Sequence, residues 1–143
     1  MSFEKSLVYR IGVGKVLGLA VGLLGFFVLP MLVDDSGLML RIGIVFWYTT
    51  LGALVGVFGI LARHPVFKLP MPWWFRGIWL GAWMNFVLVL IAYPVISQLS
   101  LEMFSATGPW ASPFWMVLEG ALIGLLIDFL LTRWFGDGWA SAD

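Results

Sequence analysis

The chain has 143 residues, of which 62% are hydrophobic and 11% charged, with a formal net charge of zero and a mean hydropathy of +1.01. One soluble domain of this length cannot bury so much apolar surface, so we expect lipid to cover it, and the zero charge argues against nucleic acid as a partner. Without cysteine, and with His64 as its one histidine, the chain cannot by itself form disulfides, Cys/His zinc sites, iron–sulfur clusters or bis-histidine haem, and thiol catalysis is excluded.

Four apolar segments are long enough to cross a bilayer, for which a helix needs about 20 residues. The first is too long for a signal peptide and ends without a small-x-small cleavage site, so we expect it to be retained. The fourth contains Glu119 and Asp128, which predicts that it is buried against protein on at least one face. We predict an all-α membrane protein with a single transmembrane domain over residues 1–143 and helices at about 12–33, 38–62, 75–98 and 113–135.

The distribution of cations predicts that both ends of the chain face the cytoplasm. One side of the predicted helices carries seven of the eight Lys and Arg residues, namely Lys5, Arg10, Lys15, Arg63, Lys68, Arg76 and Arg133. The other side carries Arg41 together with the acids Asp34, Asp35 and Glu102. Because cytoplasmic loops are enriched in Lys and Arg, we predict an N-in, C-in, multi-pass protein of a bacterial cytoplasmic (inner) membrane.

The connections between the helices are too short to form separate soluble domains. The loop before the third helix mixes prolines with aromatic and basic residues, and we expect Trp73, Trp74 and Arg76 to lie in the headgroup layer. We expect the outer segment 98–112 to form a short interfacial turn that ends at Gly108-Pro109.

The second and fourth segments resemble each other, which suggests a duplicated hairpin. They align without gaps at an offset of 68 residues, which matches Phe46 with Phe114, Trp47 with Trp115, Gly52 with Gly120 and Gly56 with Gly124. The first and third segments agree less well and share a Gly-x-x-x-Gly near one end and a proline near the other. The hypothesis is two tandem helical hairpins in parallel repeat, related by an axis along the membrane normal.

Every predicted helix carries glycines four residues apart. These are Gly14, Gly18 and Gly22 in the first helix, Gly52 and Gly56 in the second, Gly77 and Gly81 in the third, and Gly120 and Gly124 in the fourth. Residues at this spacing share one face, where two backbones can approach closely. Such a stripe serves either packing within one four-helix bundle or a seam between subunits. Four stripes exceed what one bundle needs, which favours an oligomer or a complex with a partner.

Two polar residues extend these stripes. One further helical turn takes the stripe of the fourth helix to Asp128 and that of the third helix to Asn85. At 1.5 Å per residue, Asp128 and Asn85 lie about 10 and 15 Å from the cytoplasmic ends of their helices, close enough to meet. We expect a structural bridge from Asp128 to Asn85 or to Arg63, Arg76 or Arg133, with an ion or proton path and a contact with another protein as the alternatives.

Glu119 lies on the opposite face of the fourth helix from Asp128, about 13 Å away along the helix axis. The two carboxylates therefore cannot share a metal ion or act as a catalytic pair within one chain. Glu119 is either a satisfied structural carboxylate or a group that binds a ligand or a proton. Residues that reach a similar depth are Tyr48, Tyr93, Thr49 and Arg41.

Trp79 and Trp83 lie four residues apart on one face of the third helix, too deep for the interfacial aromatic belt. They are suited to line a cavity, to pack on lipid or to contact a partner.

The sequence contains no Gly-x-Ser-x-Gly, phosphate loop, metal-ligand cluster or close carboxylate pair, so we expect no enzymatic activity, cofactor or metal. The leading hypothesis is a homo-oligomeric or accessory subunit of a membrane complex, with the lipid bilayer and either a second copy or another membrane protein as partners. It would pack through its glycine stripes, its Trp-rich third helix and its Pro/Trp loop. The alternative is a small oligomeric ion channel or transporter that uses the membrane-embedded Asp128, Asn85 and Glu119.

Overall fold

The computed structural model describes residues 3–61, 63–64, 66–104 and 108–137. Its long helices are α1 (Phe3–Leu32), α2 (Leu38–Phe58), α3 (Trp73–Ile91) and α5 (Trp115–Phe135), and its shorter ones are α4 (Tyr93–Phe104) and the 3₁₀ helix η1 (Pro109–Ala111). Within the described residues, the four long helices are each long and apolar enough to cross a membrane. The predicted all-α architecture with four membrane-spanning helices is thus confirmed, and the chain has the features of a multi-pass membrane protein.

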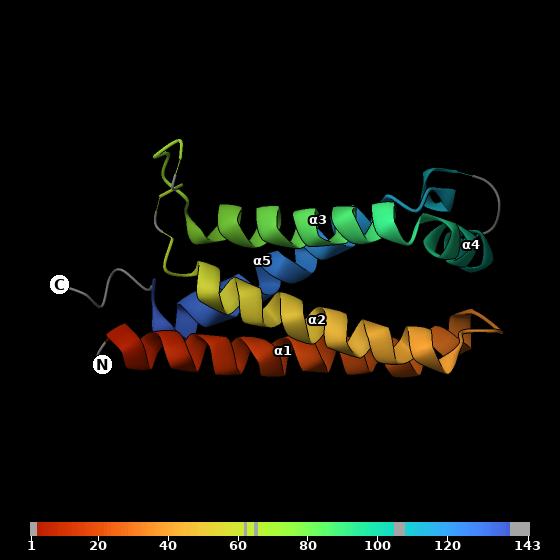
Figure 1. Ribbon diagram of the computed structural model, residues 1–143, viewed down its shortest axis with the longest axis horizontal. Helices are drawn as coiled ribbons and strands as arrows, with labels where there is room; N and C mark the ends of the chain where they lie inside the picture. Colours follow the sequence, from red (N-terminus) through yellow and green to blue (C-terminus); the bar gives the residue numbers. More distant parts are fainter. Residues whose placement is uncertain (1–2, 62, 65, 105–107, 138–143) are drawn as a thin grey trace.

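The third helix ends earlier than predicted. We expected it to run to residue 98, but α3 ends at Ile91 and α4 begins at Tyr93 in a new direction (Figure 1). The physical reason is Pro94, which has no N–H to donate to the Leu90 carbonyl and is tolerated in the first turn of a new helix. The segment 98–112 also differs from the predicted interfacial turn, because residues 98–104 belong to the 12-residue helix α4.

The first and second helices also differ from their predicted bounds, at the end of the bundle opposite α4. The first helix begins at Phe3 rather than near residue 12, because the polar residues before the apolar run continue the helix. The second helix ends at Phe58, and the predicted end at residue 62 lies outside the described residues.

The long helices form two antiparallel hairpins. Helix α1 packs along α2, and α3 packs along α5; we call these pairs hairpin A and hairpin B. Figure 1 shows α1 and α2 (red and yellow) side by side, α3 (green) on the opposite side, and α5 (blue) between them. The start of α1 and the end of α5 lie at the same end of the bundle, which we call the terminal end, and α4 lies at the other, the α4 end.

Close backbone contact at glycines holds each hairpin together. In hairpin A, a Cβ atom added to Gly14 would collide with the Gly52 carbonyl oxygen, and one added to Gly18 would collide with that of Tyr48. In hairpin B, a Cβ atom at Gly81 would collide with the Gly120 carbonyl oxygen. The same kind of contact involves Gly22, Gly56, Gly77 and Gly124. All four stripes therefore face a helix of the same chain, which is the intramolecular alternative, and they are not free to form a seam between subunits.

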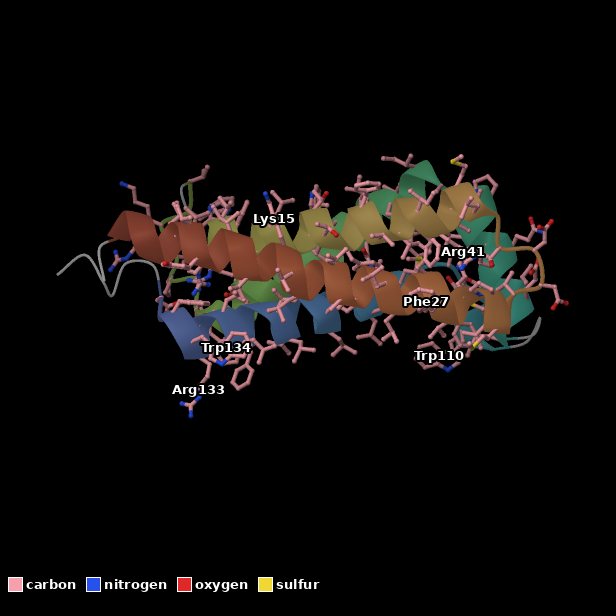
Figure 2. The ribbon with its side chains drawn as sticks, turned by 90° about the horizontal axis from the view of Figure 1, so that it is seen from below. Lys15, Phe27, Arg41, Trp110, Arg133 and Trp134 are labelled. Atoms are coloured by element: carbon pink, nitrogen blue, oxygen red, sulfur yellow. The ribbon has the colours of Figure 1, made fainter. Side chains whose placement is uncertain are left out.

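At the α4 end, Arg41 donates a hydrogen bond to a main-chain carbonyl of α1 that has lost its helical donor. Pro30 lies inside α1 and cannot donate a hydrogen bond to the Phe26 carbonyl, which would otherwise be left without its helical partner. Arg41 Nε donates to that oxygen at 2.8 Å, and its guanidinium lies 4.1 Å from the centroid of the Phe26 ring. The single cation on the predicted outer side therefore has a structural role, and Figure 2 places it beside the end of α1.

A buried apolar layer lies where the two hairpins meet. It is built from the α2, α3 and α5 residues Tyr48, Leu51, Val55, Leu80, Ile127 and Leu131. Leu51 and Leu131 are fully buried, so the contact between the hairpins is dry at this level.

Candidate functional site

Asp128 lies in a buried cluster of charges that joins the hairpins near the terminal end. Its Oδ1 accepts a hydrogen bond from Arg10 Nη2 of α1 at 2.9 Å, and its Oδ2 lies 3.4 Å from Arg76 Nε of α3. Thr132, one turn later on α5, donates to Asp128 Oδ1 at 3.3 Å. Both arginines and Asp128 are buried, with exposed side-chain fractions of 0%, 2% and 1%. Together with Asp137, they form what we call the arginine–aspartate cluster.

The surroundings of Arg10 show how α1 can bury a guanidinium. Its head packs against Gly59, the residue that caps the end of α2, and a Cβ atom there would collide with the guanidinium nitrogens. The carbonyl groups at the end of a helix carry a partial negative charge that favours a cation at this position. Among the described residues, Arg10 Nε is the one buried side-chain nitrogen or oxygen without a hydrogen-bond partner.

The segment after α5 closes the cluster. Gly136 has a positive φ of 71°, a conformation that glycine adopts easily and that turns the chain away from the helix axis. The turn brings the Gly136 carbonyl to Arg10 Nη1 and brings Asp137 Oδ1 to within 2.7 Å of Arg76 Nη2. The remaining partners of Arg76 are the backbone carbonyls of Leu61 and Met71. Two cations and two anions therefore meet at this point.

A second polar cluster joins the hairpins on the side of the apolar layer nearer α4. Tyr48 of α2 donates a hydrogen bond to Glu119 Oε2 of α5 at 2.7 Å, and Asn85 Nδ2 of α3 lies 3.3 Å from the same oxygen. Asn85 also donates to the Met116 carbonyl at 2.8 Å and accepts from Trp47 Nε1 at 3.0 Å. We call Trp47, Tyr48, Asn85 and Glu119 the glutamate–asparagine cluster.

Apolar residues separate the two clusters. Leu51 of α2 follows Tyr48 by less than one turn, and Leu80 of α3 lies between Arg76 and Asn85; both are buried. The partly buried Ile123 lies between the two carboxylates on α5 and packs against the same layer. The two clusters are thus separate sets of contacts between the hairpins, at different depths in the bundle.

The contact expected between Asp128 and Asn85 does not form. The structure places Asn85 with Glu119 and places Asp128 with Arg76, one of the expected cations, and with Arg10, which was not expected. Arg63 and Arg133, the other expected partners, are exposed. The sequence did carry a signal for Arg10, because it lies four residues before Gly14 and so extends the glycine stripe of α1.

The residues expected in the headgroup layer lie in different environments. Arg76 is buried within the protein, because its guanidinium turns into the bundle toward Asp128 and Asp137. Trp74 is 49% exposed, whereas Trp73 packs against Phe129 with ring centroids 5.4 Å apart. Figure 2 shows Arg133 and Trp134 projecting outward from α5 at the terminal end and Trp110 at the α4 end.

A row of aromatic side chains covers the outward face of α3. The rings of Trp79 and Trp83 are stacked in parallel with centroids 5.8 Å apart, and both side chains are substantially exposed. Ring contacts continue from Trp83 to Phe86, from Phe86 to Phe114, and from Phe114 to Tyr93. We call these five residues the aromatic row.

The described residues contain no group of three or more His, Asp or Glu side chains that could hold a metal ion. No protein-family model, curated protein or solved structure matches this chain. Its function must therefore be inferred from the geometry of the two clusters and from the surface that they leave free.

Proposed function

We propose that the protein is a non-enzymatic membrane component that acts as a homo-oligomeric or accessory subunit of a membrane complex. The observation that carries this proposal is that Asp128, Asn85 and Glu119, all in hairpin B, are hydrogen-bonded to side chains of hairpin A. Asp128 is held between two arginines, and Glu119 accepts from Tyr48 and Asn85. Polar groups used in this way fasten helices, and side chains fully engaged with neighbours are poorly suited to exchange an ion.

The separation of the two clusters also favours this role over transport. An ion or proton path through the membrane requires polar groups that follow one another at short intervals, and here buried Leu51 and Leu80 lie between them. The channel or transporter alternative therefore has less support than the subunit proposal.

The aromatic row supports association within the membrane plane. Trp79 and Trp83 lie about 9 and 15 Å along α3 from its first residue, deeper than the interface where exposed tryptophans gather. No hydrogen bond joins their indole N–H groups to another described side chain. An exposed indole at hydrocarbon depth gains more from a protein surface that offers an acceptor than from lipid tails.

We also propose that the two hairpins are tandem repeats with parallel orientation. Gly14 faces Gly52 in hairpin A as Gly81 faces Gly120 in hairpin B. This equates Gly14 with Gly81, which lies one turn beyond the match of Gly14 with Gly77 suggested by the sequence. The distribution of seven cations to one further supports an N-in, C-in orientation in a bacterial inner membrane.

Native mass spectrometry in mild detergent tests the subunit proposal. We expect the parent protein to appear as an oligomer or with a defined partner, and the double variant Trp79→Ala/Trp83→Ala to dissociate. Trp134→Ala is the matched control, because Trp134 is 55% exposed but lies at the terminal end.

Two results would count against the subunit proposal. One is a parent protein that remains monomeric and alone from the membrane to the instrument. The other is a flux of protons, alkali cations or halides in proteoliposomes, which would favour the transporter alternative.

A further inference from the structure

The arginine–aspartate cluster has more buried positive than buried negative charge. Arg10 and Arg76 are both buried, but among the described residues Asp128 is the one carboxylate that is buried with them. The fourth charge, Asp137, is 42% exposed and contacts Arg76 through a single 2.7 Å ion pair. A buried cation is stabilised by an anion nearby, and here one of the two anions, Asp137, lies at the surface.

Asp137 also lies beyond the end of α5. It follows Gly136, at which the chain has left α5, and the cluster holds this segment through the Gly136 carbonyl and the Asp137 carboxylate. The other acceptors around Arg76 are the uncharged carbonyls of Leu61 and Met71. An anion that replaced Asp137 would therefore meet a buried guanidinium that, on that side, has no other carboxylate partner among the described residues.

We propose that Arg76 and Arg10 form a binding site for a phosphate group, supplied by an anionic phospholipid headgroup, and that Asp137 is its built-in competitor. A guanidinium offers paired N–H donors that match two phosphate oxygens, and a phosphate carries more acceptor oxygens than the carboxylate it replaces. The site lies at the terminal end, where the spanning helices reach the headgroup layer. Exposed Arg133 and Trp134 project from α5 at this same end, as Figure 2 shows, and both residue types favour that layer.

The test measures lipid retention by the purified full-length protein. The parent, Asp137→Asn and Asp137→Lys are incubated in detergent with dioleoylphosphatidylglycerol or dioleoylphosphatidylcholine, and retained lipid is counted by native mass spectrometry. Asp137→Asn removes the competitor without adding bulk, so we expect about two- to fivefold more phosphatidylglycerol retained, the factor that corresponds to a partly exposed ion pair. Asp137→Lys removes the same competitor and adds a cation that attracts a phosphate, so it should retain at least as much phosphatidylglycerol as Asp137→Asn.

Two controls separate this site from general attraction. Asp35→Asn removes an exposed acid from the turn at the α4 end and should leave retention unchanged. Phosphatidylcholine has no net charge and should be retained equally by all variants. Inorganic phosphate, titrated against bound phosphatidylglycerol, distinguishes the two sources of the group, since release of the lipid at millimolar phosphate would show that the site takes free phosphate as readily.

The proposal is overturned if Asp137→Asn and Asp137→Lys retain no more phosphatidylglycerol than the parent does. It is also overturned if Asp35→Asn raises retention as much as Asp137→Asn does, because the effect would then follow net charge rather than the site.

Discussion

Replacing Asp128 by Asn should lower the free energy of unfolding, and a second substitution should recover part of that loss. Asparagine keeps the size of the side chain and one acceptor oxygen but removes the charge between two buried arginines. Removing one partner of a buried ion pair costs about 3–5 kcal/mol, whereas a hydrogen bond between membrane helices is worth about 0.6 kcal/mol on average. Because the remaining oxygen can still accept one bond, we expect a loss of about 3 kcal/mol in the free energy of unfolding.

The double variant Asp128→Asn/Arg10→Gln restores the charge balance. It leaves Arg76 paired with Asp137, so the cluster again has one cation and one anion. We expect the double variant to be more stable than the sum of the two single losses predicts, by at least about 1 kcal/mol. The free energy of unfolding is measured in mixed micelles with increasing sodium dodecyl sulfate, followed by circular dichroism, with Asp34→Asn as an exposed control.

Two outcomes would refute this reasoning. If Asp128→Asn costs less than about 1 kcal/mol, Asp128 acts as a simple hydrogen-bonding group and its charge is unimportant. If the losses of the single variants add without any coupling, Arg10 and Asp128 do not stabilise each other in the folded protein.

Three further predictions concern the glycine contacts, Arg41 and the orientation of the chain in the membrane. Gly81→Leu should separate α3 from α5 and lower stability by about 1–3 kcal/mol or more, whereas Gly43→Leu, where no atom lies within 4 Å of an added Cβ, should be neutral in the same unfolding assay. Arg41→Met leaves the carbonyl freed by the proline in α1 without a donor and should cost about 1–3 kcal/mol; an unchanged unfolding curve would show that water replaces the guanidinium. In intact cells, an impermeant thiol reagent should label a cysteine at Ser36 but not one at Lys68, and the reverse labelling would contradict the proposed orientation.

Local properties of the sequence predicted the spanning helices, because hydrophobicity and length decide whether a segment can cross a bilayer. Arg76 was among the predicted partners of Asp128, but the contact between Asp128 and Asn85 was mispredicted, because it depends on the register between helices. The contacts of Gly81 with Gly120 and of Gly77 with Gly124 fix α3 antiparallel to α5, and this register carries Asn85 to Met116. Asn85 then lies beside Glu119, which precedes Asp128 on α5 by about two and a half turns.

Arg10 and Pro94 show what a stricter use of the sequence would have found. Arg10 lies on the extended glycine stripe of α1 in the same way that Asp128 lies on that of α5. Pro94 indicated the end of α3 through its missing N–H. The contribution of Asp137 could not be predicted, because it depends on the turn at Gly136 and on where α1 and α3 begin relative to the end of α5.

Association of the separated hairpins tests most directly whether the two polar clusters fasten hairpin A to hairpin B. Residues 1–67 and 68–143 are expressed together as two chains, divided beside exposed Phe67, and recovery of the second chain on a tag carried by the first is measured. We predict that the two chains purify together, and that Asp128→Asn combined with Glu119→Leu greatly reduces recovery while Gly43→Leu does not. Undiminished recovery after both clusters are removed would show that apolar packing alone joins the hairpins and would contradict the account.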